Sequence, residues 1–178
     1  MPDVRQQIRE DRGLLKKIQG VIPGFAGYRA REDLRAADNI IRIQLAERLG
    51  KTRSRLEESR AELAEKYAKE NITKVGGLIN KFKEIEGTVR HADQGYTGIS
   101  PMLRIEDAEI NHLYEFDLSM CNGIAGMDAS VGRIKAAVLS EKATDVKFEL
   151  LELDRLLKEF KEVFDRRLEV ITGTATVQ

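Results

Sequence analysis

The 178-residue sequence has no tryptophan, six phenylalanines, four tyrosines and no long apolar run. Few aromatic residues and a charged fraction of 34% are typical of long helices rather than of a compact sheet core. The hydrophobic fraction of 42% is too high, and its residues are too regularly spaced, for a disordered chain. No stretch approaches the roughly 18 apolar residues that a membrane span requires. Composition therefore predicts a folded, mainly helical protein without a membrane-spanning segment.

Cysteine is almost absent. Cys121 is the single cysteine and has no partner for a disulfide within the chain, which favours a reducing compartment. The N-terminal stretch MPDVRQQIREDRG lacks the apolar core of a secretion signal. We therefore expect a cytoplasmic protein.

Net charge is also absent, since thirty basic residues balance thirty acidic ones. This balance argues against a dedicated nucleic-acid binder, which needs a strong basic field. The charges are unevenly placed, however. Residues 1–60 carry fourteen Lys and Arg against nine Asp and Glu, whereas residues 93–128 carry seven acidic residues against one arginine. We expect these segments to meet, within one chain or between subunits. The candidate partners are Glu106, Asp107 and Glu109 on one side and Arg29, Arg31 and Arg35 on the other.

Apolar residues recur at steps of three and four along most of the sequence. This spacing predicts an all-α fold, an antiparallel bundle of four to five helices in which the long helices are heptad-patterned and coiled-coil-like. We expect one helical domain over residues 1–172 and a flexible tail at 173–178. Within the domain we expect a possible coiled-coil hairpin over 29–92, a central helix over 101–139 and a C-terminal helix over 144–172.

The N-terminal half contains two glycine-rich interruptions. The loop GVIPGFAGY, beginning at Gly20, should end the first helix. The second helix should then carry a thin apolar stripe from Ile41 to Tyr67. Gly76 and Gly77 predict a kink or break within the following stretch KENITKVGGL.

The most regular apolar seam runs from Ile110 to Val138, which predicts that this helix is central and contacted from two sides. Asp117 interrupts the seam with a carboxylate. Two readings stay open for it. It is either a partly solvated position near a helix end, or a buried carboxylate paired with Arg or Lys of another helix and fixing the register.

Glu109 and His112 form an E-x-x-H step, which places both side chains on one helical face. Ferritin-like diiron bundles use this spacing, together with a second E-x-x-H and two further glutamates. The second motif is missing, and Glu84 and His91 could join only across a hairpin. One such step among thirty acidic residues is close to chance. We expect no metal and no cofactor, with Glu109 and His112 as the runner-up ligands.

No catalytic residue stands out. Gly50-Lys51-Thr52 copies the end of a phosphate-binding loop but lies in a predicted helix, without the glycine five residues earlier. Cys121 lies beside apolar residues in the acidic segment, which indicates a small buried hydrophobe rather than a nucleophile.

Two connecting segments, VIPGFAGY and GYTGISPML, are unusually apolar. Exposed apolar loops would contact a partner or a membrane. The alternative, which we favour, is that they fold back and plug the ends of the bundle.

These features predict a non-enzymatic structural or adaptor protein that binds no nucleic acid. It would self-associate, as a homo-oligomer, or bind another helical protein through its heptad faces. The first alternative is a peripheral membrane-binding or membrane-remodelling protein using the first helix and VIPGF as an anchor. The second is a diiron ferritin-like bundle. The expected partner-contact residues are Leu56, Leu63, Leu157 and Phe164.

Overall fold

The structure, a computed structural model, is all-α. It describes residues 4–28, 34–66, 69–92, 107–140 and 143–172. These ranges contain five helices and no strand, so the predicted fold class is confirmed. The helices are α1 (Val4–Val21), α2 (Leu34–Lys66), α3 (Lys69–His91), α4 (Asp107–Leu139) and α5 (Ala143–Thr172).

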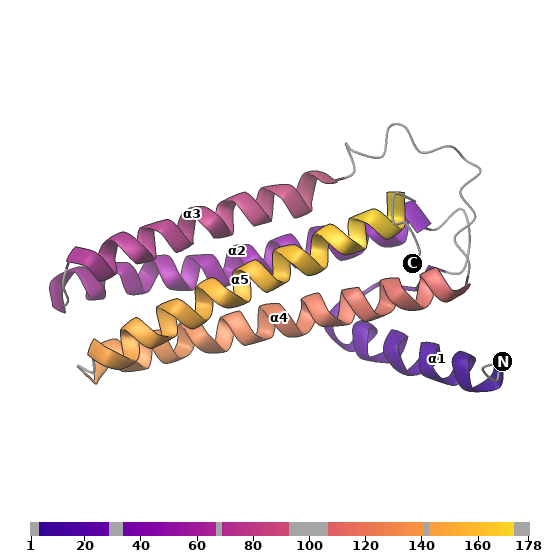
Figure 1. Cartoon of the computed structure of the whole chain (residues 1–178), viewed down its shortest axis with the longest axis horizontal. Helices are drawn as coiled ribbons and strands as arrows, with labels where there is room; N and C mark the ends of the chain where they lie inside the picture. Colours follow the sequence, from indigo (N-terminus) through magenta and orange to yellow (C-terminus); the bar gives the residue numbers. More distant parts are fainter. Residues whose placement is uncertain (1–3, 29–33, 67–68, 93–106, 141–142, 173–178) are drawn as a thin grey trace.

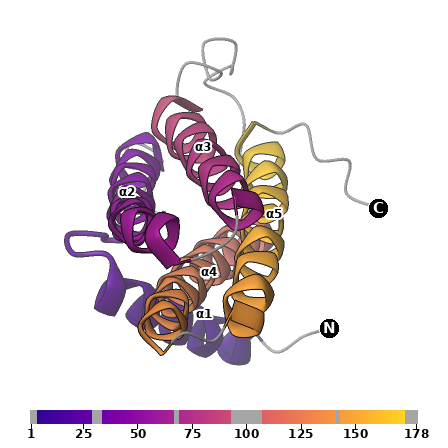
Figure 2. The same ribbon diagram turned by 90° about the vertical axis from the view of Figure 1, so that its left-hand side faces the viewer.

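Helices α2 to α5 form a four-helix bundle, and α1 lies outside it against α4 (Figures 1 and 2). The bundle consists of two antiparallel hairpins, α2–α3 and α4–α5. Their packing places α2 alongside α4 and α3 alongside α5, each pair running in the same direction (Figure 1). Helix α4 contacts α1, α2 and α5, which confirms its predicted central position.

The core consists of the apolar seams that the sequence presents at steps of three and four. Every residue expected on the central seam from Ile110 to Val138 is buried, as are the residues expected on α2 from Ile41 to Leu63. Each large apolar side chain removed from water in this way contributes about 1.5–3 kcal/mol before entropy is counted. Within the described helices, no stretch combines the length and hydropathy that a bilayer-crossing segment requires.

Of the kink or break expected between residues 69 and 78, the break is wrong, because α3 continues as one helix through Gly76 and Gly77. The chain instead reverses direction before this stretch, between α2 and α3 (Figure 1). Each glycine costs a helix about 1 kcal/mol relative to alanine. Val75 and Phe82 are completely buried on the same helix, and this apolar packing outweighs the cost.

The basic N-terminal segment and the acidic segment meet within one chain, because α1 and α2 both pack against α4. Arg55 of α2 pairs with Asp128 of α4. Of the specific partners expected, Arg29, Arg31 and Glu106 lie outside the described residues, as do the loop GYTGISPML and the tail 173–178. Arg35 is exposed at the start of α2, and Glu109 is half-buried in α4.

The segment VIPGFAGY, described as far as Tyr28, folds back into the bundle as expected. Ile22, Phe25 and Tyr28 are 0%, 2% and 3% exposed. Gly24 and Gly27 have positive φ angles of 81° and 101°, which residues with a Cβ rarely adopt. Within the VIPGF part of the proposed interfacial anchor, Ile22 and Phe25 thus face the protein interior.

Candidate functional site

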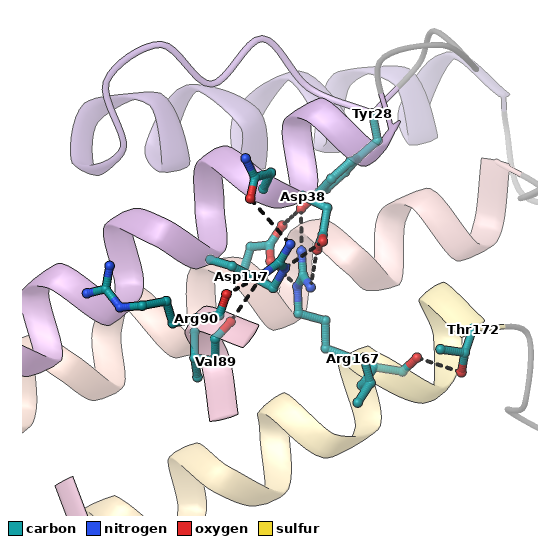
Figure 3. Close-up of polar contacts among 10 residues, drawn as sticks. Tyr28, Asp38, Val89, Arg90, Asp117, Arg167 and Thr172 are labelled. Carbon is teal, nitrogen blue, oxygen red and sulfur yellow. Dashed lines mark hydrogen bonds and ion pairs between the residues drawn. The ribbon is translucent and has the colours of Figure 1, made fainter. Parts of the chain in front are cut away.

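Five polar side chains lie together inside the bundle, at the end where α2 and α4 begin and α3 and α5 finish (Figure 3). We call them the ion-pair cluster. Each is at most 3% exposed. The members are Tyr28, which follows α1, Asp38 and Arg42 of α2, Asp117 of α4, and Arg167 of α5.

Arg167 is the centre of this cluster. Its Nε donates to Oδ1 of Asp117 at 2.6 Å, and its Nη1 donates to Oδ1 of Asp38 at 2.7 Å. Its Nη2 donates to the Tyr28 hydroxyl oxygen at 2.9 Å, and that hydroxyl in turn donates to Oδ2 of Asp117. The planar fork of the guanidinium therefore holds groups from three segments at once.

Arg42 extends the cluster to the end of α3. Its Nε donates to Oδ2 of Asp38 at 2.7 Å. Its Nη1 donates to the backbone carbonyl oxygens of Val89 and Arg90 at 3.3 Å and 3.0 Å. The last carbonyls of a helix have no intrahelical donor and carry partial negative charge, so a buried cation there satisfies both needs.

The two carboxylates differ electrostatically although they share Arg167. Burial opposes the charged form of Asp38, but Arg167 and Arg42 outweigh it and hold the pKa below its ordinary value. Burial raises the pKa of Asp117, and the opposing effects of Arg167 and of the Tyr28 hydrogen bond do not fully offset it. Burial also raises the pKa of Tyr28 well above its ordinary value, so its hydroxyl stays a donor.

The loop after α1 is positioned by a second set of contacts. The Tyr28 backbone N–H donates to the Tyr114 hydroxyl at 3.1 Å. The Phe25, Tyr28 and Tyr114 rings pack together with centroids 5.1–6.3 Å apart. A Cβ added at Gly27 would lie 2.7 Å from the Tyr114 hydroxyl oxygen, so this position excludes a side chain by space as well as by φ.

The cluster ties four bundle helices and the loop after α1 into one arrangement. Sliding α5 by one turn would move Arg167 by about 5 Å. Two buried carboxylates would then lose a cation, which costs several kcal/mol. The second reading of Asp117, a buried carboxylate paired with an arginine of another helix, is therefore confirmed. The partner itself was not predicted, because the adjacent Leu168 fits the apolar spacing of α5 equally well although it is only half-buried.

The histidine of the E-x-x-H step does not face the bundle interior. The His112 side chain is 62% exposed, and its Nδ1 lies 3.3 Å from Oε2 of Glu115. His91 and Glu84 are exposed on α3. Among the described residues, no three His, Cys, Asp or Glu side chains form a group that could hold a metal ion. An inward-facing set of ligands like that of diiron bundles is thus not assembled around His112.

The candidate phosphate-binding residues and the candidate nucleophile both lie within helices of the bundle. Lys51 and Thr52 lie within α2, where the backbone amides are used by the helix rather than presented to a phosphate. Cys121 is 5% exposed, and burial raises the pKa of its thiol to about 11, so it stays protonated near neutral pH.

The expected partner-contact residues lie in the core of the chain's own bundle. None of them is more than 1% exposed. They are Leu56 and Leu63 of α2 and Leu157 and Phe164 of α5. Their apolar character is explained by packing within the chain.

The described surface instead exposes three large apolar side chains at the other end of the bundle. Leu139 is 63%, Phe148 66% and Leu151 56% exposed. Leu139 ends α4, and the other two lie in the first turns of α5. We call these three residues the apolar edge. Phe148 also lines a surface hollow of about 380 Å³ with Ala136 and Ala137.

Comparison with protein-family models, with curated proteins and with solved structures gives no match.

Proposed function

We propose that the protein is a non-enzymatic structural or adaptor protein whose bundle binds another helical surface, on a second copy or on a different protein. The observation that carries the proposal is the apolar edge. Single exposed apolar residues are ordinary, but three of them lie near the end of the bundle where α4 finishes and α5 begins, and Phe148 among them lines a hollow, as expected of a contact surface.

The energetics favour contact through this edge. Leu139 and Phe148 keep more than half of their surface in water, whereas the seams that could otherwise bind a partner are already buried. Covering a large apolar side chain contributes on the order of 1.5–3 kcal/mol. Because these side chains are already fixed on helices, binding costs less conformational entropy than ordering a flexible loop.

A cytoplasmic location is part of the proposal. Cys121 is the single cysteine of the sequence and lies buried among apolar residues of α4. Its thiol therefore has no role that requires an oxidising compartment.

The test is a double substitution, Leu139→Gln with Phe148→Gln, measured by sedimentation and by cross-linking in extracts of the cells that make the protein. Both side chains are exposed, so circular dichroism should be unchanged. Association with a second copy or a partner should weaken at least tenfold. The matched control is Arg155→Gln with Glu162→Gln, on exposed positions of α5. The proposal fails if the apolar-edge variant and the control associate equally.

A further inference from the structure

Helices α3 and α5 enclose a groove on the face of the bundle, and two hollows lie along it. The first is about 290 Å³ and the second about 170 Å³. Lys81 lines both hollows, so they adjoin. The apolar residues lining the first are Leu78, Leu150 and Leu151, and those lining the second are Ile85 and Leu157.

We propose that this groove binds an acidic amphipathic helix of a partner protein, with two apolar side chains seven residues apart seated in the two hollows. The inference rests on the proposed adaptor function and names the partner's chemistry. Leu157, one of the residues expected from the sequence to contact a partner, lines the second hollow.

The spacing of the two hollows matches side chains i and i+7 of a helix. On α3, Leu78 lines one hollow and Ile85 the other; on α5, Leu150 and Leu157 do the same. Both pairs are seven residues apart, a rise of about 10.5 Å. Because α3 and α5 run in the same direction, both displacements point along the groove from the first hollow to the second. A third helix lying in the groove presents side chains i and i+7 at this distance, as in helix-in-groove recognition.

The size of the two hollows allows each to hold a side chain of the partner. A cavity on the order of 150 Å³ lined by aliphatic side chains accommodates a benzene ring. The hollow of about 170 Å³ therefore suits one leucine or phenylalanine side chain, and the hollow of about 290 Å³ has room for one such side chain and more. The ion pair between Lys81 and Asp154 spans the two helices and divides the groove, which favours two anchors over one ligand.

The charges around the hollows indicate which residues should flank the two apolar side chains of the partner. The hollows are lined by four lysines against two acidic residues. The lysines are Lys74, Lys81, Lys158 and Lys161, and the acidic residues are Glu84 and Asp154. The ion pairs of Lys158 with Asp154 and of Lys161 with Asp165 join partly exposed groups. Such pairs are worth at most about 1 kcal/mol, so a partner's carboxylates can replace them.

A second copy fits the groove less well. The exposed apolar side chains that the described part of α5 offers, Phe148 and Leu151, are three residues apart rather than seven. Leu151 itself lines the first hollow. An acidic helix of another protein is therefore the occupant to which the spacing and charge point.

The experiment uses the full chain and three labelled synthetic peptides, with binding measured by fluorescence anisotropy. The first peptide is a helix with leucines at i and i+7 and flanking glutamates. The second replaces the glutamates by lysines, and the third replaces the two leucines by serines. We expect the first to bind at least tenfold more tightly than either of the others.

A charge reversal makes the test specific to the groove. Lys158→Glu with Lys161→Glu should invert the preference between the acidic and basic peptides. Lys16→Glu with Lys51→Glu, at exposed positions of α1 and α2, makes the same change in net charge and should leave the preference intact. Circular dichroism and the melting temperature of both variants establish that each is folded.

Equal binding of all peptides, no binding of the acidic peptide, or an unchanged preference after reversal at Lys158 and Lys161 overturns the inference. A dimer of the wild type that dissociates on this reversal also overturns it, because a second copy then occupies the groove. The adaptor proposal is judged separately, by loss of association in the Leu139 and Phe148 variant. A groove that fails therefore leaves that proposal standing.

Discussion

Replacing Arg167 by methionine tests whether the ion-pair cluster fixes the bundle. The substitution keeps an unbranched side chain of similar reach but removes the donors to Asp117, Asp38 and Tyr28. Asp38 would then keep the guanidinium of Arg42, whereas Asp117 would keep the Tyr28 hydroxyl but lose its arginine. Breaking a buried pair from one side costs about 3–5 kcal/mol. We expect a loss of this size in the free energy of unfolding.

The adjacent residue supplies the control. Arg166 is exposed on the same turn of α5, so Arg166→Met removes the same charge without touching the cluster. Urea unfolding followed by circular dichroism should place Arg167→Met several kcal/mol below the wild type and Arg166→Met within about 0.5 kcal/mol of it. For a chain of this size the loss corresponds to a fall in melting temperature of roughly 6–20 °C.

The same variant has a pH signature. Burial already raises the pKa of Asp117, and without Arg167 it rises further, so the cost of the charged form is present at neutral pH and relieved as pH falls through the raised value. Asp38 loses the largest of the charges that lower its pKa, so the stability that it gives above the unfolded-state pKa is smaller in the variant. The deficit of Arg167→Met should therefore shrink on acidification. An unfolding free energy equal to that of Arg166→Met, or a deficit independent of pH, would refute the assigned role.

Three further predictions follow from individual contacts. Gly27→Ala should destabilise by at least about 1 kcal/mol more than Gly24→Ala in urea unfolding, since both sites have positive φ but only Gly27 faces a hydroxyl at 2.7 Å. Asp38→Asn should cost at least about 1 kcal/mol more than Asp117→Asn at pH 7. The lowered pKa of Asp38 gives stability that is present above the unfolded-state pKa and is lost as pH falls. The raised pKa of Asp117 acts oppositely, so the difference in unfolding free energy between the two variants should close below about pH 4. His112→Ala should change stability by less than about 0.5 kcal/mol, and elemental analysis of protein purified without chelator should find iron, manganese and zinc far below one equivalent; two bound metals per chain would reverse this.

The helices were predictable because their apolar residues recur at helical spacing. The seam from Ile110 to Val138 is a local property of the sequence, and burial of each member follows from the period alone. The turn between α2 and α3 was not predictable in the same way. Gly76 and Gly77 are strong local signals for a break, but packing of α3 against α2 outweighs them.

The ion-pair cluster was only half visible in the sequence. Asp117 stood out because it interrupts a regular seam. Arg167 occupies an apolar step as well, three residues after Phe164 and four before Ile171, but Leu168 beside it satisfies the pattern equally. Which of two adjacent residues enters the core depends on the carboxylates that α2 and α4 bring there, and that is tertiary information.

The apolar edge and the groove could not have been found from periodicity. Phe148 and Leu151 look like ordinary members of an amphipathic helix, and their exposure follows from where α3 and α4 lie beside α5. Conversely, Leu56 and Leu63 look like a free stripe in the sequence but are covered by the chain's own helices.

The most direct test of the proposed function is photo-cross-linking from one reactive side chain placed at Phe148, inside the cells that make the protein. The control places the same group at Ser54, an exposed position of α2. We predict an adduct from position 148 that maps to a helical segment of a second copy or of a partner protein, and background labelling from position 54. Equal labelling from both positions, or no adduct from position 148, would contradict the account.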